Sequence, residues 1–314
     1  MEFIKPLIIP SRLLTPNFDI DLYQSLNNNN NNFKKVGNLK TTVEKIVTSK
    51  TIELNSDGKK INMSVVSTIV KYTFVDFIIK MNGRFNVAFA IDFTGSNYSG
   101  LIDRHCYKKD ESENYYIKAI KLCGTVLDEY SSDHIFPTFG FGAVINDNVS
   151  HCMNVNFQDN PGISTLDNVI QEYRNCLKKI GLGGPTYICP IIDNFKNIIN
   201  NNKSSSIYNI LMIITDGIIE DINNVINSVV DAQSLPLSIN IIGIGDEPTT
   251  EMRKLNMEYG PLYDSNNKRM DRKVVTYIHF KQYKDNFNLL KNELMKTIPE
   301  NVIEYLNEYN KMKN

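Results

Sequence analysis

Short apolar runs, each bounded by polar or turn-forming residues, recur along the chain after residue 85. A run of about four to eight such residues is typical of a strand that is buried on both faces. The pattern predicts strands at Asn86–Ile91, Ile135–Phe141, Cys152–Phe157, Asn209–Thr215, Ser238–Gly243 and Val274–Phe280. Apolar residues spaced by three and four positions predict helices near Glu113–Tyr130, Thr165–Ile180, Pro190–Asn201, Ile222–Leu235 and Asp285–Leu306.

The predicted strands and helices alternate, which indicates an α/β domain with a doubly wound, mostly parallel six-stranded sheet and helices on both faces. Asn86–Ile91 is expected at its centre. Cys152–Phe157 is the exception, because the short polar loop before it leaves no room for a crossover helix, so we expect an antiparallel edge strand there. In the last helix, the apolar positions expected to face the core rather than a partner are Leu289, Leu290, Leu294 and Ile298.

The chain before residue 76 is organised differently. A tract of six asparagines, Asn27–Asn32, cannot bury apolar area and predicts disorder. Thr51–Leu54 and Ile61–Val66 flank the turn-forming Asn55–Gly58 as in a β-hairpin. The predicted organisation is therefore a disordered, low-complexity segment (1–35), a short β-rich segment (36–75), the α/β domain (76–306) and a tail (307–314).

Charge and cysteine content restrict the setting of the protein. Residues 1–85 carry 12 Lys and Arg against 7 Asp and Glu, although the whole chain of 314 residues has a formal charge of −1. This basic end favours weak contact with acidic membranes, although a solvated face is the more ordinary explanation, and no nucleic-acid partner is expected. Five scattered cysteines and the lack of a signal sequence indicate a reduced protein of the cytoplasm, with a peripheral position at the plasma membrane as the alternative. No apolar stretch reaches the ~20 residues of a membrane-spanning helix.

Candidate metal ligands follow two of the predicted strands. Asp92, Thr94 and Ser96 end the first strand, and Asp216 ends the strand that begins at Asn209. Open α/β sheets bind ligands at the carboxyl ends of their strands, and hard cations such as Mg²⁺ take oxygen ligands. Thr186 lies in a glycine-rich loop that could face the same edge. On the first segment alone, a buried Asp that caps the next turn is an equally good interpretation.

Four ordered segments resemble the copine family. Ile91-Asp92-Phe93-Thr94-Gly95-Ser96-Asn97 resembles the "IDFTASN" signature of that family, with Gly95 where Ala is usual. The segments that resemble "FPALGFGA", "IITDG" and "LPMSI" begin at Phe136, Ile213 and Leu235. The resemblance covers roughly residues 76–305 and implies a von Willebrand factor A-like fold with a metal-ion-dependent adhesion site. Carried over to this chain, the implied ligands are Asp92, Thr94, Ser96, Thr186 and Asp216.

The resemblance also implies a function. Bound Mg²⁺ or Mn²⁺ would complete its shell with an acidic residue from an intracellular protein partner, in signalling or membrane trafficking. Residues 36–75 weakly resemble the end of a C-two domain, the β-sandwich with which copines bind Ca²⁺ and phospholipid. Because Asp19, Asp21 and Asp57 form no calcium cluster, Ca²⁺ is expected only if C-two domains precede this sequence. The chain is then either a genuine short form or a truncated gene model of a full-length copine.

Other functions have less support in the sequence. A ubiquitin-ligase scaffold with a similar A domain would need a RING, yet no cysteine follows Cys189. His105-Cys106 and His151-Cys152 lack the close ligand pairs of closed zinc sites. Gly243-Ile244-Gly245 lacks the rest of a nucleotide-binding loop, and no catalytic base for a kinase is evident, so we expect no enzyme activity.

Overall fold

The computed structural model describes residues 18–25, 33–42, 45, 51–56, 59–64, 72–99, 102–107, 111–131, 133–202, 204, 206–246 and 248–313. The chain divides into two compact units, Met1–Thr73 and Phe74–Asn314. Each unit has its own sheet. The candidate ligands all belong to the second unit.

The first unit contains a four-stranded sheet in the order β1-β2-β3-β4. Its strands are β1 (Phe18–Ser25), β2 (Phe33–Thr41), β3 (Thr51–Ser56) and β4 (Lys59–Ser64). The predicted hairpin is confirmed, because β3 pairs with β4 in antiparallel register. The prediction of disorder for residues 1–35 is wrong for β1 and the start of β2. In β1, apolar Phe18, Ile20 and Leu22 alternate with polar residues, and this two-residue period is typical of a strand. The Asn27–Asn32 tract lies outside the described residues.

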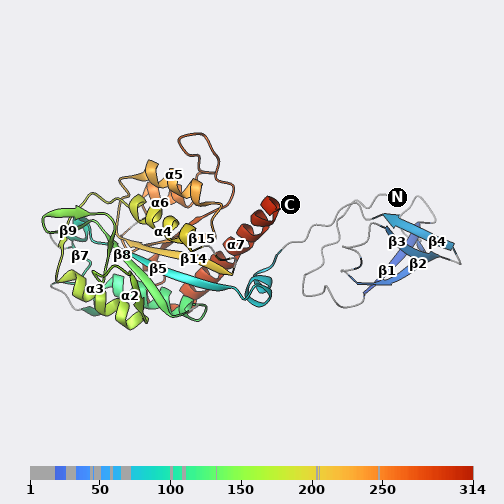
Figure 1. The fold of residues 1–314 in the computed structure, drawn as a ribbon, viewed down its shortest axis with the longest axis horizontal. Helices are drawn as coiled ribbons and strands as arrows, with labels where there is room; N and C mark the ends of the chain where they lie inside the picture. The colour runs from blue at the N-terminus through green and yellow to red at the C-terminus, as the bar shows by residue number, and fades with distance from the viewer. Residues whose placement is uncertain are drawn as a thin grey trace. The chain divides into compact units, whose positions relative to one another are not determined.

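The second unit is built on a mostly parallel sheet in the order β11-β8-β5-β14-β15-β16. Figure 1 labels β8, β5, β14 and β15 of this sheet. The parallel strands are β5 (Arg84–Asp92), β8 (Ile135–Phe141), β14 (Ile207–Thr215), β15 (Leu237–Gly243) and β16 (Val275–His279). The fold prediction is confirmed, including the antiparallel edge strand, which is reduced to β11 (Met153–Asn154). The sheet has seven strands rather than six because β12 (Gly162–Ser164) also pairs with β8. Three residues are too few to show a periodic pattern.

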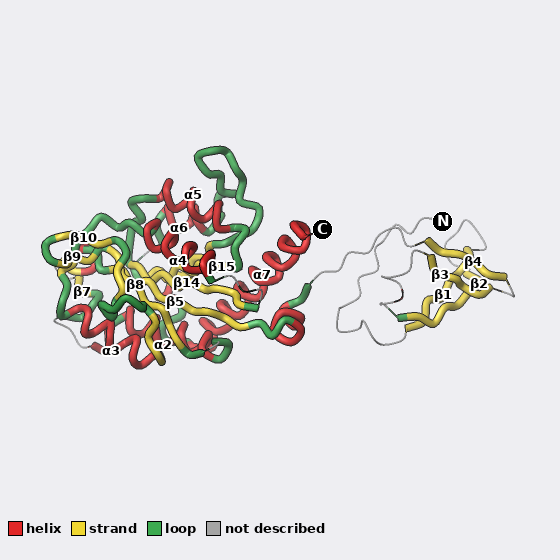
Figure 2. The backbone as a smooth tube through the Cα atoms, in the orientation of Figure 1, coloured by secondary structure: helices red, strands yellow, loops and turns green. Residues whose placement is uncertain are grey.

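Helices cover both faces of this sheet. Figure 2 shows the strands between two groups of helices, with α4, α5 and α6 on one side and α2 and α3 on the other. The helices are α2 (Tyr115–Asp128), α3 (Leu166–Leu177), α4 (Cys189–Asn201), α5 (Ile222–Ala232), α6 (Thr250–Leu255) and α7 (Phe287–Lys313). Helix α7 packs against α2. Helix α6 was not predicted, since its six residues span less than two turns.

The core face predicted for the last helix needs one correction. Leu290, Leu294 and Ile298 of α7 are fully buried, whereas the side chain of Leu289 is 50% exposed. Adjacent residues on an α-helix point about 100° apart, so Leu289 cannot share the face of Leu290.

Burial of the central strands on both faces explains their apolar sequences. In β5, Ala88 and Ala90 join the cluster under α4 and α5, while Phe89 and Ile91 are buried on the opposite face. A fully buried Ile or Phe side chain stabilises the fold by about 1.5–3 kcal/mol, and an unpaired charge in its place would be costly. The charged side chains of β5 are consequently confined to its two ends, and Asp92 lies where the strand reaches the edge of the sheet.

Candidate metal centre

Two neighbouring parallel strands bring the two candidate carboxylates together. Ile91 of β5 lies opposite Ile214 of β14 in the sheet register. Asp92 is the last residue of β5, and Asp216 directly follows β14. Because the strands are parallel, their carboxyl ends meet at the same edge. The sheet therefore delivers both acidic side chains to one place.

Hydroxyl groups link these carboxylates into a continuous network. The Asp92 Oδ1 atom accepts hydrogen bonds from the Thr94 backbone amide at 2.8 Å and from the Thr94 hydroxyl at 2.6 Å. The hydroxyls of Thr94 and Ser96 lie 3.0 Å apart, and the Ser96 hydroxyl donates to Asp216 Oδ1 at 2.9 Å. On the other side, Thr215 Oγ1 donates to Asp92 Oδ2 at 2.6 Å. Four of the five predicted ligands thus form one group, in which each side chain lies within hydrogen-bonding distance of the next.

The loop after β5 has the tight geometry that this network requires. It turns through a short 3-10 helix, Gly95–Asn97. The Asn97 side chain donates to the Thr94 carbonyl at 3.2 Å and accepts from the Tyr116 hydroxyl at 2.7 Å. Gly142, at φ 73°, packs so closely that a Cβ atom there would meet Thr94. A glycine is therefore needed at this position both for its backbone conformation and for the space that Thr94 occupies.

Thr186, the fifth predicted ligand, lies in a loop that begins against the same turn. At its start, the Gly183 carbonyl accepts from the Gly95 amide at 2.5 Å. Thr186 itself is buried, its amide donates to Glu220 Oε2 at 2.6 Å, and its carbonyl accepts from the Glu220 amide at 3.1 Å. The Thr186 loop is thereby held between the loops that follow β5 and β14, on the predicted side of the sheet.

The far end of the Thr186 loop is fixed at the start of α4. Asp221 accepts hydrogen bonds from the amides of Ile188 and Cys189 at 3.2 and 2.8 Å, which satisfies orphan donors of the helix.

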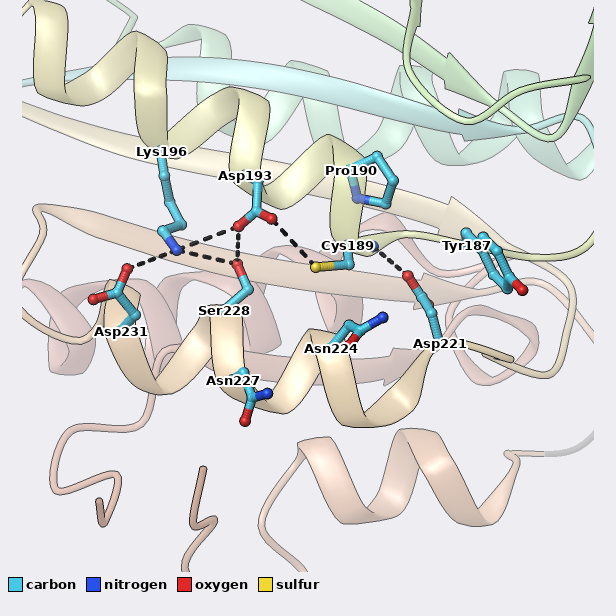
Figure 3. A pocket seen from close by; sticks show the side chains of 10 residues that line it. All are labelled: Tyr187, Cys189, Pro190, Asp193, Lys196, Asp221, Asn224, Asn227, Ser228 and Asp231. Carbon is cyan, nitrogen blue, oxygen red and sulfur yellow. Dashed lines mark hydrogen bonds and ion pairs between the residues drawn. The ribbon is translucent and has the colours of Figure 1, made fainter. Parts of the chain in front are cut away.

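Asp221 also lines a groove of about 660 Å³ between α4 and α5 (Figure 3). In that groove Lys196 bridges Asp193 and Asp231, and Ser228 donates to Asp193 at 2.6 Å. These polar groups satisfy one another, so the groove is best explained as the polar seam that holds α4 on α5.

The electrostatics of the site fit a cation. Burial, followed by the nearby charge of Asp216, raises the pKa of Asp92 to about 6 despite its hydrogen bonds. Burial also raises the pKa of Asp216, although the hydrogen bond from the Ser96 hydroxyl and the charge of Arg104 lower it in part. Two buried carboxylates at one edge carry a desolvation cost that a bound cation would relieve.

The donor set of carboxylates and hydroxyls suits hard cations such as Mg²⁺ and Mn²⁺. Among the residues that the structure describes, no group of three or more His, Cys, Asp and Glu side chains could hold a metal ion. The cluster at the sheet edge has only two carboxylates. A metal here would accordingly depend on the hydroxyls and on water to complete its shell.

Several neighbours of the cluster were not found from the sequence. They are Arg104, Thr215, Glu220 and Asp246. Arg104 Nε lies 3.4 Å from Asp216 Oδ2. Only Thr215 carried a signal, since it directly precedes Asp216 at the end of an apolar run. Nothing in the local sequence around Arg104 pointed to this contact.

One of the two histidines considered for zinc, His105, belongs to the core instead. His105 is buried and stacks on Tyr116, with ring centroids 4.4 Å apart. Its Nδ1 atom lies 2.7 Å from the Tyr173 hydroxyl. Burial lowers the pKa of His105 to about 3, so the ring is neutral at pH 7.

Fold and site together define an α/β domain with an oxygen-rich cluster where its parallel strands end. The sequence profile of the copine family, described as Copine, matches residues 104–314, which is more than half of the chain. The chain belongs to the copine family. Thr186 and Asp216 lie inside the matched region, whereas Asp92, Thr94 and Ser96 precede it.

A solved structure offers a more distant likeness. It is the crystal structure of manganese-loaded Plasmodium vivax TRAP protein, whose sequence is 12% identical to this chain and whose fold matches it with a TM-score of 0.40. The alignment covers 65% of this chain and 72% of that one.

Within the described part of the present chain, no helix is both long and apolar enough to cross a membrane.

Proposed function

We propose that this chain is a metal-dependent protein-binding module. Asp92, Thr94, Ser96, Thr186 and Asp216 would hold Mg²⁺ or Mn²⁺, and the bound metal would offer a coordination position to an acidic side chain of a partner protein. The observation that carries this proposal is the single network of two buried carboxylates and the hydroxyls that bridge them. Membership of the copine family supports it.

The residues of the chain have separate tasks in this proposal. Asp92 and Asp216 supply the negative charge, and Thr94 and Ser96 supply neutral oxygens between them. Thr215 and the Thr94 amide orient the Asp92 carboxylate from both sides. Such outer partners commonly change metal affinity by about 10–100-fold when they are removed. The hydroxyls of the cluster donate to carboxylates that are themselves proposed metal ligands, so we propose binding rather than catalysis.

The cellular setting is part of the same proposal. We place the protein in the cytoplasm, where it would connect intracellular proteins in signalling or membrane trafficking, and where the basic amino-terminal part would contact acidic membranes weakly. Calcium-dependent phospholipid binding is not proposed for residues 1–314, because it would need C-two domains upstream.

Metal binding is tested first, by titrating the full chain with MgCl₂ or MnCl₂ in a calorimeter. Binding is expected for the natural sequence and should be lost in Asp92→Asn. Asp159→Asn is the matched control, because Asp159 is an exposed aspartate in the loop between β11 and β12. Equal metal affinity in all three proteins would contradict the site.

Partner binding is tested by capture from cytosolic lysate. Metal-dependent partners should be retained when EGTA removes Ca²⁺ in the presence of Mg²⁺. They should be lost when EDTA removes all divalent ions, and also with Asp216→Ala. Retention in EDTA would show that binding does not need the metal.

A further inference from the structure

A second carboxylate position adjoins the candidate metal centre. The Asp246 carboxylate is held there by two cationic side chains from distant parts of the chain. Arg104 Nη2 lies 3.5 Å from Asp246 Oδ2, and Lys281 Nζ pairs with Asp246 Oδ1. The two cations therefore already bind a carboxylate of the chain itself.

The sheet places this position beside Asp216. Strands β14 and β15 are parallel neighbours, and Thr215 lies opposite Gly243. The Ile244 amide donates to the Thr215 carbonyl at 2.9 Å, and a Cβ atom on Gly245 would meet the Asp216 carbonyl oxygen. Asp246 follows immediately, so its carboxylate lies at the same edge as the candidate ligands.

Arg104 connects the two positions. Its Nε atom faces Asp216 Oδ2 at 3.4 Å, while its Nη2 atom faces Asp246. The Arg104 amide donates to the Asn97 carbonyl at 2.9 Å, which ties its backbone to the turn after β5. The side chain is only 17% exposed. A guanidinium held in this way is pre-organised and loses little further freedom when it binds a carboxylate.

Asp246, in contrast, can be displaced. Its side chain is 78% exposed and that of Lys281 is 34% exposed. Ion pairs with such exposure contribute little to stability, because water screens them and two side chains must be ordered. A carboxylate from a partner could replace that of Asp246 without disturbing the core.

We propose that Arg104 and Lys281 form an anion subsite for a second carboxylate of the partner protein. Asp246 occupies this subsite in the free protein. The favoured partner is an acidic segment with two nearby carboxylates, one for the metal and one for the subsite. The role of the first carboxylate rests on the proposed function, whereas the subsite rests on the ion pairs of Arg104 and Lys281.

The test measures peptide binding to the full chain in saturating Mg²⁺ by calorimetry. The probes are acetylated and amidated peptides with either one glutamate or two glutamates separated by zero to three glycines. The best two-glutamate peptide is expected to bind about tenfold more tightly than the one-glutamate peptide. Arg104→Gln and Lys281→Gln should each reduce this advantage, the ratio of the two peptide affinities, to below about threefold. Asp246→Asn should strengthen only two-glutamate binding.

The control variant is Lys291→Gln, because the Lys291 side chain is 36% exposed and also pairs with a carboxylate, that of Glu129. It should leave the advantage unchanged. Since Arg104 also contacts Asp216, Lys281→Gln and Asp246→Asn decide the outcome independently of the metal ligands. An unchanged advantage in Lys281→Gln, or no gain in Asp246→Asn, would overturn the subsite.

Two further results separate this inference from the proposed function. If the one-glutamate peptide binds only with Mg²⁺ and with an intact Asp92, but a second glutamate adds nothing, the metal-dependent module stands and the subsite is refuted. If two-glutamate binding ignores both Mg²⁺ and Asp92→Asn but depends on Lys281, the subsite stands and the proposed function fails.

Discussion

Lowering the pH from 7 to 5 should destabilise the protein through His105. The ring is buried against Tyr116 and Phe93. Its pKa is about 3 in the folded protein, mainly because of burial, against 6.5 as the ordinary value. A histidine with a lowered folded-state pKa contributes stability above its unfolded pKa, and this contribution is lost as the pH falls from 6.5 toward 3.

The two pKa values set the magnitude. One pKa unit corresponds to 1.36 kcal/mol, and from pH 7 to pH 5 the unfolded imidazole goes from about one-quarter protonated to almost fully protonated, while the folded one binds almost no proton. The free energy of unfolding should therefore fall by about 2 kcal/mol from this group. Asp92 acts in the opposite direction: its pKa is raised to about 6, so the folded state gains stability as this carboxyl is protonated.

Urea unfolding of the natural protein and His105→Phe at both pH values separates the two effects. Phenylalanine keeps an aromatic ring in the site but cannot ionise, and the contribution of Asp92 is common to both proteins. The natural protein should lose about 2 kcal/mol more than the variant. An equal loss in both proteins would show that His105 is not held neutral in the core. Because His105 follows Arg104, its burial also matters for the position of that guanidinium.

Four further predictions concern the metal site, its supports and the membrane. Mg²⁺ at about a hundredfold excess over its dissociation constant should stabilise the protein by about 2.7 kcal/mol in thermal unfolding, and Asp92→Ala should abolish that gain; no shift in the natural protein would contradict the site. Gly142→Ala should cost roughly 1–3 kcal/mol in urea unfolding, since the backbone there has φ 73° and a Cβ atom would meet Thr94. Asp221→Ala, which removes the acceptor for two amides at the start of α4, should cost about 1–2 kcal/mol in the same assay and weaken metal binding through the Thr186 loop; unchanged values would show that the loop is fixed otherwise. Sedimentation of residues 1–314 with acidic liposomes should not need Ca²⁺ and should vanish as salt shortens the screening length from about 10 Å at 0.1 M to about 3 Å at 1 M; strong calcium-triggered sedimentation would refute this.

The sequence by itself determined the frame of the α/β domain. The central parts of β5 and β14, residues 87–91 and 210–214, are apolar because both of their faces are buried, and a fully buried strand can carry charge only at its ends. This rule places Asp92 and Asp216 at the edge of the sheet from the sequence alone. The alternation of strands and helices then indicated that the strands run parallel. These properties are local, so they can be detected in a single segment.

Short elements and distant contacts were decided by the tertiary structure. Strand β12 and helix α6 are too brief to show a periodic pattern. Strand β1 lies in a segment that was predicted to be disordered because of the nearby asparagine tract. Ser96 and Asp216 are 120 residues apart in the chain, and Lys281 reaches Asp246 across 35 residues. Arg104 lies beside Asp216 and Asp246 only because β5, β14 and β15 are neighbours. Strand order depends on the packing of the whole domain, and the local spacing of polar residues carries no information about it.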